Sequence, residues 1–402
     1  MGNRRTLALL AVGMVTTTLL AAVGLDEVRV TDYQHEARPA YDALIAGDVS
    51  GFFAHLPAYA GTLLLHAPVA LLAGSLGGSA QVVFTAVAVP ALIGLLALSV
   101  WLATTVPGRG GWVVLGVATL NPIAYQALDY GHPEEILVGV LSVAAVLVAQ
   151  RERPVLAGVM LGLAIVAKPW ALLAVGPVLL ALPRGQVRAL LATGAIGVVF
   201  TLPVLLFGGT ATRIAPHTGT VFHPWQLWWF FGDGGSPANG IEGYRDAPAW
   251  IVSLTHPLIV LLGFALSAVW ARRGRDRTDA VGLLAFLLLM RCVLDPWNNP
   301  YYELPFLLAL LAWECARGAR FPFATVTLTL LAWLTFVTAP KYVLPDVYCA
   351  LFLAWSLPTL LTIGALVYAP DRTRALFARL RERLPDGDTK LTLRRSAPST
   401  GR

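Results

Sequence analysis

Apolar runs of membrane-spanning length recur from Leu7 to Ala369, and they constrain the fold more than any other feature. A helix needs about 20 mainly apolar residues to cross the hydrocarbon core of a bilayer. Apolar residues make up 57% of the 402 positions and charged residues only 13%, so little sequence remains for a water-soluble domain. Because backbone groups in lipid must bond to one another, the sequence predicts an all-α, polytopic integral membrane protein.

We expect about twelve transmembrane helices within a single membrane domain, residues 1–370, followed by a basic cytoplasmic tail, residues 371–402. The first run could be mistaken for a removable signal, but it is long enough to span and we interpret it as a retained helix. The predicted spans are 7–25, 80–105, 112–126, 134–150, 154–167, 170–183, 189–207, 250–271, 279–294, 303–316, 321–338 and 347–369.

Positive charge orients these helices. In this arrangement 22 of the 29 Lys and Arg residues fall on the side of the N-terminus. Cytoplasmic loops carry the excess of Lys and Arg, so we expect a multi-pass protein of the plasma membrane with both termini in the cytoplasm. The short runs 154–167 and 170–183 meet at Lys168-Pro169; merging them would move every later Arg cluster outside. The three cysteines have no metal-ligand or paired spacing.

The long segment 26–79 lies outside in this topology and holds six of the 23 acidic residues. Within it, Glu36–Ile45 has Pro39 near its start and Gly47 after its end, which predicts a short helix. Ala60–Gly74 is apolar but interrupted by His66 and Pro68, and we expect a helix that lies in the membrane interface. The six carboxylates are Asp26, Glu27, Asp32, Glu36, Asp42 and Asp48.

Several residues at the outer helix ends are candidates for a binding site. Glu134 and Glu135 suit the dipole of the helix that they begin, while His132 just before them could bind phosphate or orient a carboxylate. Lys168 and Arg291 are cations at the ends of spans, where a cation has a partner, binds an anion, or extends to the interface.

Two outer segments are rich in aromatic and polar side chains. The turn after Arg291 contains Asp295, Trp297, Asn298 and Tyr302, more polar groups than an ordinary short loop requires. The loop 208–249 contains His223 and Trp225 in an aromatic run. Such aromatics are typical of the interfacial belt, and they would equally suit a sugar platform or a groove for a lipid tail.

Taken together, these segments resemble the GT-C membrane glycosyltransferases. The resemblance rests on the early Asp of the outer loop, the Gly131-His132-Pro133-Glu134 turn, the run from Ala157 to Lys168-Pro169-Trp170, and the Arg291–Tyr302 turn. It covers nearly the whole chain and is strongest for the bacterial branch that uses polyprenyl-phosphate sugars, including mannosyltransferases of envelope glycolipids. The chain departs from the common pattern at Tyr59-Ala60-Gly61, where relatives have Tyr-Pro-Pro.

The resemblance implies an inverting hexosyltransferase that moves a sugar, with mannose expected, from a polyprenyl-phosphate donor to an envelope glycolipid or glycan at the outer face. It implies that Asp32 is the catalytic base. The expected partners are this donor, the acceptor and the bilayer, with no nucleic acid. No cofactor is expected; no Asp-x-Asp pair marks a metal site, although a divalent ion stays open. We expect Arg291, Lys168 and His132 at the donor phosphate, and Glu135, His223, Trp225, Asp295, Trp297, Asn298 and Tyr302 at the substrates.

An alternative from another class is a transporter or flippase of a lipid-linked precursor. This function would also explain cations at membrane depth. It predicts repeated halves and charged residues in the middle of helices, and the sequence shows neither.

Overall fold

The computed structural model describes residues 2–25, 32–57, 59–208, 221–234, 243–274, 276–371 and 373. These residues form an all-α fold, as predicted, with one two-stranded antiparallel sheet. The elements are α1 (Gly2–Gly24), η1 (Tyr33–Ala37), α2 (Arg38–Ile45), α3 (Val49–Ala54), α4 (Ala60–Ser75), α5 (Ala80–Thr105), α6 (Gly110–Thr119), α7 (Pro122–Asp129), α8 (Pro133–Gln150), α9 (Pro154–Ala167), η2 (Pro169–Ala174), α10 (Val175–Ala181), α11 (Gln186–Phe207), β1 (Val221–Phe222), η3 (Trp229–Phe231), β2 (Arg245–Asp246), α13 (Ala249–Arg272), η4 (Arg277–Asp279), α14 (Ala280–Leu294), α15 (Leu304–Ala316), α16 (Phe323–Trp333), η5 (Leu334–Thr338), η6 (Ala339–Lys341) and α17 (Pro345–Tyr368).

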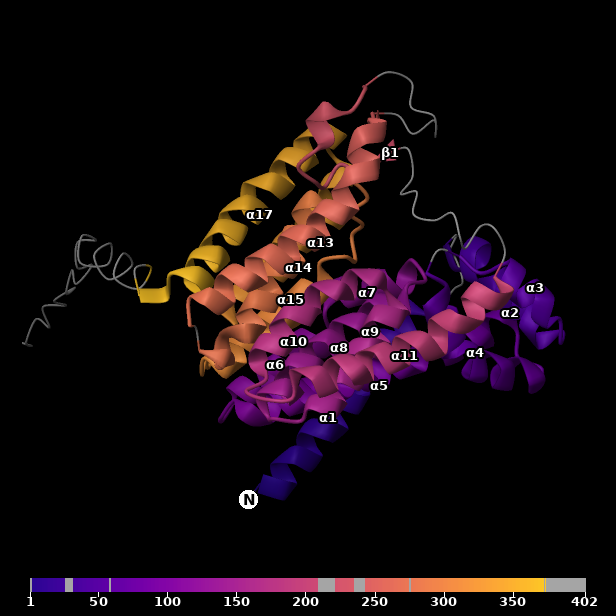
Figure 1. The fold of residues 1–402 in the computed structure, drawn as a ribbon, viewed down its shortest axis with the longest axis horizontal. Helices are drawn as coiled ribbons and strands as arrows, with labels where there is room; N and C mark the ends of the chain where they lie inside the picture. Colours follow the sequence, from indigo (N-terminus) through magenta and orange to yellow (C-terminus); the bar gives the residue numbers. More distant parts are fainter. Residues whose placement is uncertain are drawn as a thin grey trace, which may run out of the picture.

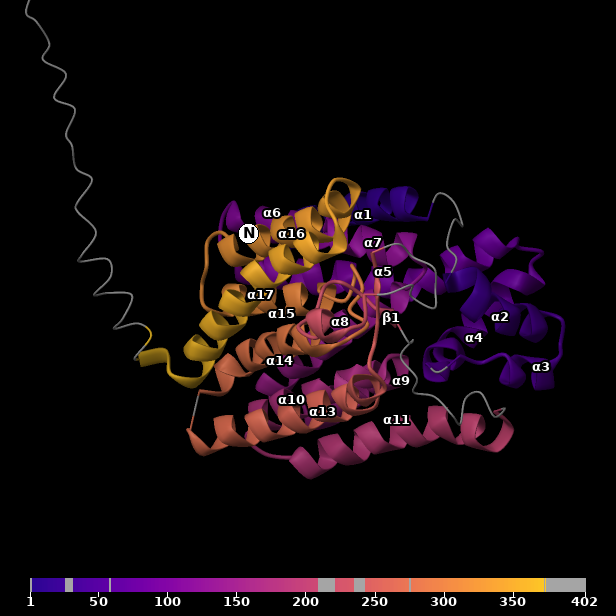
Figure 2. The same cartoon turned by 90° about the horizontal axis from the view of Figure 1, so that it is seen from above.

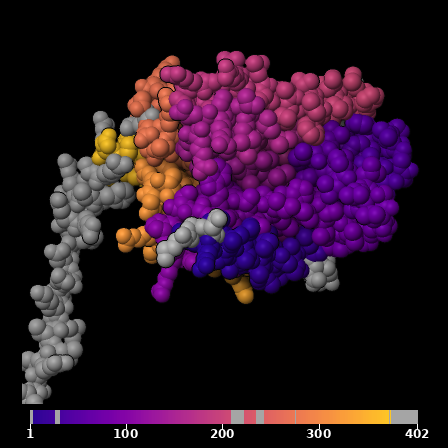
Figure 3. Space-filling view, turned by 90° about the horizontal axis from the view of Figure 1, so that it is seen from below, coloured from indigo at the N-terminus to yellow at the C-terminus, as the bar shows by residue number. Residues whose placement is uncertain are grey.

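The long helices run roughly side by side, and the short helices α2, α3 and α4 gather at one end of the bundle (Figures 1 and 2). The beginning of α1 and the end of α17 both lie toward the opposite end. In the space-filling view of Figure 3, the violet lobe of α2–α4 closes one end of the molecule. Phe207 at the end of α11 packs on Phe53 of α3, with ring centroids 5.4 Å apart. The segment α2–α4 is therefore joined to the bundle by packed side chains.

Helices α8, α14 and α15 form the centre of the molecule. Nearly all side chains of α14 and α15 are buried, as is most of α8. Helices that are apolar all round belong in an interior, since they have no polar face to turn outward. Four charged residues are buried at the ends of these helices. Glu134 and Glu135 lie in the first turn of α8, Arg291 lies in the last turn of α14, and Glu303 lies just before α15.

The twelve segments predicted to span are helical in the structure. Among the described residues, eight helices are long and apolar enough to cross a membrane, and 154–167, 169–181 and 304–316 are shorter apolar helices. This supports a multi-pass membrane protein, while twelve crossings stay a prediction. The predicted helix 112–126 corresponds to two helices, α6 and α7, which together cover a longer stretch. The helix is broken between them because the Asn121 side chain accepts a hydrogen bond from the amide of Ile123 (2.9 Å) and so caps α7, and because Pro122 has no N–H.

The helix break predicted at Lys168-Pro169 is present. Lys168 is extended (φ −149°, ψ 124°), so α9 ends before it and η2 begins after it. Gly158 and Gly162 of α9 face α11; a Cβ on Gly158 would lie 2.2 Å from the carbonyl oxygen of Ala189. These glycines therefore permit close helix packing.

Part of the first loop also agrees with the sequence. The predicted helix 36–45 corresponds to α2 with η1 before it, and Gly47 follows at φ +79°. Helix α4 runs through His66 and Pro68, and its placement in the interface stays a prediction. The structure adds α3, which Asp48 caps through the amide of Gly51 (2.8 Å). Asp26 and Glu27, and the predicted tail apart from Asp371 and Thr373, lie outside the described residues.

Candidate active site

Asp32 and His132 meet at the end of the bundle formed by α2–α4. Asp32 directly precedes η1, and His132 occupies the tight turn between α7 and α8, where Gly131 has φ +83° and Pro133 begins α8. The distance from His132 Nε2 to Asp32 Oδ2 is 3.1 Å. The Asp32 side chain is 38% exposed while that of His132 is only 7% exposed, so an accessible carboxylate is in contact with a buried imidazole.

His132 is held between two carboxylates. Its Nδ1 lies 2.7 Å from Glu134 Oε1, on the opposite side of the ring from Asp32. Burial alone would lower the pKa of His132, but Glu134 and Asp32 more than offset this effect and raise the pKa to about 9. At neutral pH the imidazolium donates to both carboxylates. The contact with His132 also fixes the orientation of the Asp32 carboxylate.

Lys168 contacts the carboxylate of Glu134, which holds His132, and also the neighbouring carboxylate of Glu135. Its Nζ lies 3.1 Å from Glu134 Oε1 and 3.5 Å from Glu135 Oε1, with all three side chains nearly inaccessible. The ammonium also lies 4.3 Å from the ring centroid of Tyr59. The extended backbone at Lys168 directs the side chain inward, and two carboxylates and an aromatic face compensate its charge.

Arg291, in the last turn of α14, lies between two aromatic rings. Its guanidinium carbon is 4.8 Å from the ring centroid of Trp170 and 4.0 Å from that of Tyr302. Its Nε is 3.5 Å from Asp295 Oδ2. Nη1 is buried and has no hydrogen-bond partner among the described residues. Buried donors without a partner are rare in folded proteins, so this atom is available to an anionic ligand.

The turn between α14 and α15 is tied to the aromatic loop. The Asn298 amide donates to Glu303 Oε1 (2.8 Å) and to the carbonyl oxygen of Trp225 (2.9 Å). The His223 amide donates to the carbonyl oxygen of Pro296 (3.2 Å). These bonds hold residues 223–227 against the end of α14.

His223 and Trp297 form an aromatic pair in this turn. Their ring centroids are 4.5 Å apart with an interplanar angle of 31°. Burial lowers the pKa of His223 to about 4, so this ring is neutral at physiological pH. Trp225 instead packs inward, with ring centroids 5.0 Å from Phe336 and 5.5 Å from Tyr348. His223 and Trp297 are therefore better suited to contact a sugar than Trp225.

The comparisons with known proteins define the family. Residues 60–296 match the sequence model of glycosyltransferase family 87. The chain belongs to glycosyltransferase family 87. It is thus an enzyme of the glycosyl-transferring class. No curated protein and no solved structure matched the chain in the other two comparisons. The matched region includes His132, Lys168 and Arg291 but begins after Asp32, so the role of Asp32 rests on its geometry and on the sequence resemblance.

The structure of this family 87 glycosyltransferase brings most predicted site residues into one connected group. Asp32, His132, Lys168 and Glu135 form a chain of contacts through Glu134, and Trp170 joins Glu135 to Arg291 by donating its indole N–H to Glu135 Oε1 (3.4 Å). Tyr302 joins this group through its contact with Arg291. The other predicted residues reach it through Asp295, which is paired with Arg291: the backbone amides of Trp297 and Asn298 donate to Asp295. His223 and Trp225 in turn contact Trp297 and Asn298, respectively.

Some members of the site had no predicted role. Tyr59 donates to the Glu36 carboxylate and lies under Lys168, and His256 Nε2 is 3.3 Å from Asp295 Oδ1. His66 is buried in α4, and neither of its ring nitrogens has a hydrogen-bond partner within the described parts of the chain. A histidine within an apolar helix was the signal that could have identified His256 and His66, because polar groups at membrane depth are costly. Tyr59 gave no such signal, since a lone tyrosine also suits packing.

Metal ligation has no support from the described part of the chain. There, no group of three or more His, Cys, Asp or Glu side chains is arranged to hold an ion.

Proposed function

We propose that this glycosyltransferase is an inverting enzyme of GT-C architecture that uses a polyprenyl-phosphate sugar, with mannose as the expected sugar. The acceptor is an envelope glycolipid or glycan at the outer membrane face. The observation that carries this proposal is the partly exposed Asp32 carboxylate held 3.1 Å from a buried histidine, at the edge of a cluster that also contains Arg291. A base and an anion site thus lie at the same end of the bundle.

In the proposed reaction, the Asp32 carboxylate takes the proton of an acceptor hydroxyl as that hydroxyl oxygen bonds to the anomeric carbon of the donor. The bond from this carbon to the phosphate oxygen breaks, the electron pair leaves with the phosphate, and the configuration inverts. Phosphate is a good leaving group, so no general acid is required. His132 acts as a positioning residue, because it holds Asp32 without needing to contact a substrate.

Arg291 is the stronger of the two candidate phosphate ligands. Two carboxylates already compensate the charge of Lys168, whereas Arg291 has one carboxylate at 3.5 Å and a buried nitrogen without a partner. A guanidinium can bind two phosphate oxygens at once, and fixed donors at a departing group stabilise the transition state. We therefore assign the donor phosphate mainly to Arg291, and to Lys168 the role of holding Glu134 and Glu135.

The proposed topology has twelve spans in the plasma membrane, both termini in the cytoplasm and α2–α4 outside. The positive-inside rule supports it, as does the position of α1 and α17, whose chain ends lie away from α2–α4 (Figure 2).

Cysteine labelling tests this topology. Ser50 and Arg272 are exposed at opposite ends of the bundle, while the native Cys292, Cys315 and Cys349 are buried. With an impermeant thiol reagent and intact cells, we expect labelling of Ser50→Cys and none of Arg272→Cys, with both labelled after lysis. Labelling of Arg272→Cys in intact cells would contradict the proposed orientation.

The donor is tested in proteoliposomes with purified protein. We expect transfer from polyprenyl-phosphate mannose and none from the matching nucleotide sugar. Arg291→Lys is expected to transfer more slowly although it keeps the charge, because lysine lacks the planar fork. Arg38→Lys, at an exposed pair with Asp42, is the matched control and should equal the wild type. Transfer from the nucleotide sugar without any lipid-linked intermediate would reject the proposed donor.

A further inference from the structure

A small cavity lies where α2, α4 and α5 meet the first turn of α8. Its volume is about 10 Å³, the lower limit for holding one buried water molecule. Side chains from all four helices line it, among them Tyr41 of α2, Thr62 and His66 of α4, Phe84 of α5 and Glu134 of α8. Because Glu134 also contacts His132 and Lys168, the cavity adjoins the candidate active site.

Two polar side chains of α4 face this cavity without protein partners. Thr62 Oγ1 and both ring nitrogens of His66 have no hydrogen-bond partner among the residues that the structure describes, and these residues are only 3% and 1% exposed. Thr62 and His66 are four positions apart, so they lie one turn from each other on the same face of the helix. Buried polar groups in folded proteins are almost always paired, and ordered water serves where no protein atom does.

The chemistry of these two side chains suits a water molecule. Whichever tautomer the histidine has, each ring nitrogen is either a donor or an acceptor, and a hydroxyl can be both. The Glu134 carboxylate on the opposite wall offers acceptor oxygens. A buried water needs two to four polar partners, and the three side chains provide that number.

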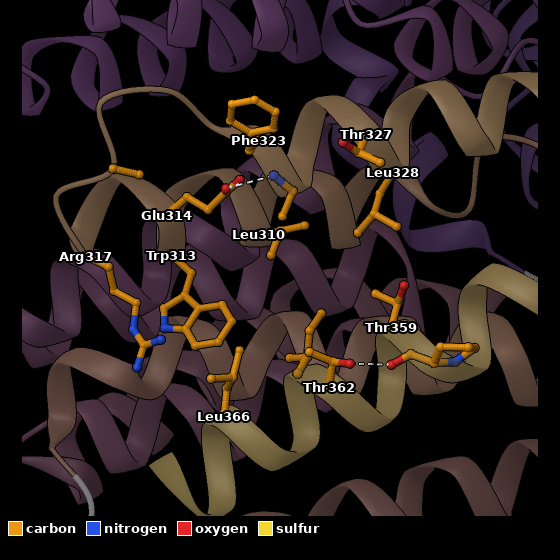
Figure 4. A pocket seen from close by; sticks show the side chains of 14 residues that line it. Leu310, Trp313, Glu314, Arg317, Phe323, Thr327, Leu328, Thr359, Thr362 and Leu366 are labelled. Carbon is orange, nitrogen blue, oxygen red and sulfur yellow. Dashed lines mark hydrogen bonds between the residues drawn. The ribbon is translucent and has the colours of Figure 1, made fainter. Parts of the chain in front are cut away.

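The larger cavity between α15, α16 and α17, shown in Figure 4, has a different character. Its volume is about 590 Å³ and its wall is mostly apolar. Its charged side chains already have partners, since Glu314 accepts from the amide of Ala324 (3.0 Å). Arg317 is paired with Asp279 (3.3 Å). The small cavity instead combines unpartnered polar atoms with room for one small molecule.

We propose that the small cavity binds one ordered water, which joins Thr62 Oγ1 and a ring nitrogen of His66 to the carboxylate of Glu134. The water accepts from the Thr62 hydroxyl and donates to Glu134. Through this water His66 is a positioning residue, because Glu134 lies 2.7 Å from His132 Nδ1 and so holds the imidazole that contacts Asp32. Helix α4 is thereby linked to the carboxylate that takes the proton.

The two parts of this inference have different foundations. The water site follows from the cavity and the side chains that line it. The effect of the water on turnover rests on the proposed function, because His66 acts on the reaction only if Asp32 is the base.

A crystal or cryo-EM structure of the full chain, at a resolution that shows ordered water, tests the site. We expect a water peak within about 3.2 Å of Thr62 Oγ1 and of one His66 nitrogen. The peak should be lost in His66→Phe, whose larger ring fills the cavity. A wild-type structure without this peak would reject the water site, whether or not Asp32 is the base.

Steady-state kinetics test the positioning role. We expect His66→Phe to lower kcat about tenfold with KM unchanged, since displacing a catalytic group can cost up to about a hundredfold. His66→Gln keeps a donor and an acceptor and should restore most of the rate. Thr62→Val, which replaces the hydroxyl by a methyl group, should lower kcat in the same direction, and it carries the test if His66→Phe does not fold.

His55→Phe is the matched control. His55 is exposed, its ring contacts the carbonyl oxygen of Gly51 (2.7 Å), and this variant should transfer sugar at the wild-type rate. Wild-type kcat in His66→Phe would reject the positioning role, and an equal loss in His66→Gln would assign His66 to packing. A fully active Asp32→Asn enzyme that still shows the water peak would reject the base and leave the water site in place.

Discussion

Replacing Asp32 by Asn is expected to lower turnover by a factor of about 10² to 10⁴, the usual contribution of a general base. The amide cannot accept the proton of the attacking hydroxyl, yet it keeps the size of the side chain and a contact with His132. Folding should therefore persist. Steady-state rates in proteoliposomes measure the effect, and the melting temperature shows whether the protein remains folded.

Asp42→Asn is the matched control for the base. Asp42 lies in α2, close to Asp32 in the sequence, its side chain is 58% exposed, and its ion pair with Arg38 is a surface pair within one helix. Such pairs contribute at most about 1 kcal/mol to stability, so this variant should transfer sugar at the wild-type rate. A fully active Asp32→Asn enzyme would show that another group takes the proton.

Replacing Lys168 by Met is expected to reduce the free energy of unfolding by about 3–5 kcal/mol. Methionine fills most of the same volume, but it leaves Glu134 and Glu135 buried without the cation that lies 3.1 and 3.5 Å from them. Denaturant titration in mixed micelles measures the loss. Activity should fall as well, since Glu134 also holds His132.

Lys341→Met provides the comparison, because Lys341 is exposed in η6. Substitutions at such surface positions usually change the free energy of unfolding by less than about 0.5 kcal/mol. If both lysine variants were equally stable, the two carboxylates would have to be protonated or solvated, and the described ion pairs would be wrong. A variant that combines Lys168→Met with Glu134→Gln should recover part of the stability.

The helices were predictable because a chain in lipid has few alternatives. The segments 80–105 and 154–167 match α5 and α9 at both ends, since apolar runs bounded by Ser79, Pro154 and Lys168-Pro169 leave little freedom. The break at Asn121-Pro122 was missed because the apolar pattern continues through it. Hydropathy reports burial along the chain and not where the backbone changes direction.

The site was predictable only in part. Lys168 and Arg291 could be singled out because a cation at membrane depth is costly without a partner. Two of their partners could not be identified, because Tyr59 and Trp170 are also ordinary packing residues and lie far in the sequence from Lys168 and Arg291, respectively. For His132 the sequence left two contacts open, phosphate or a carboxylate, and the structure places a carboxylate on each ring nitrogen.

The contact between Asp32 and His132 joins residues that are 100 positions apart in the chain. The two buried cations likewise lie on rings from distant segments, Lys168 on Tyr59 and Arg291 on Trp170. Contacts of this kind form late, because the intervening chain must first be ordered. A newly inserted chain would therefore hold its helices in the bilayer before it has any reacting centre. Activity then requires complete tertiary assembly. An incompletely folded copy is inactive and does not catalyse a wrong transfer.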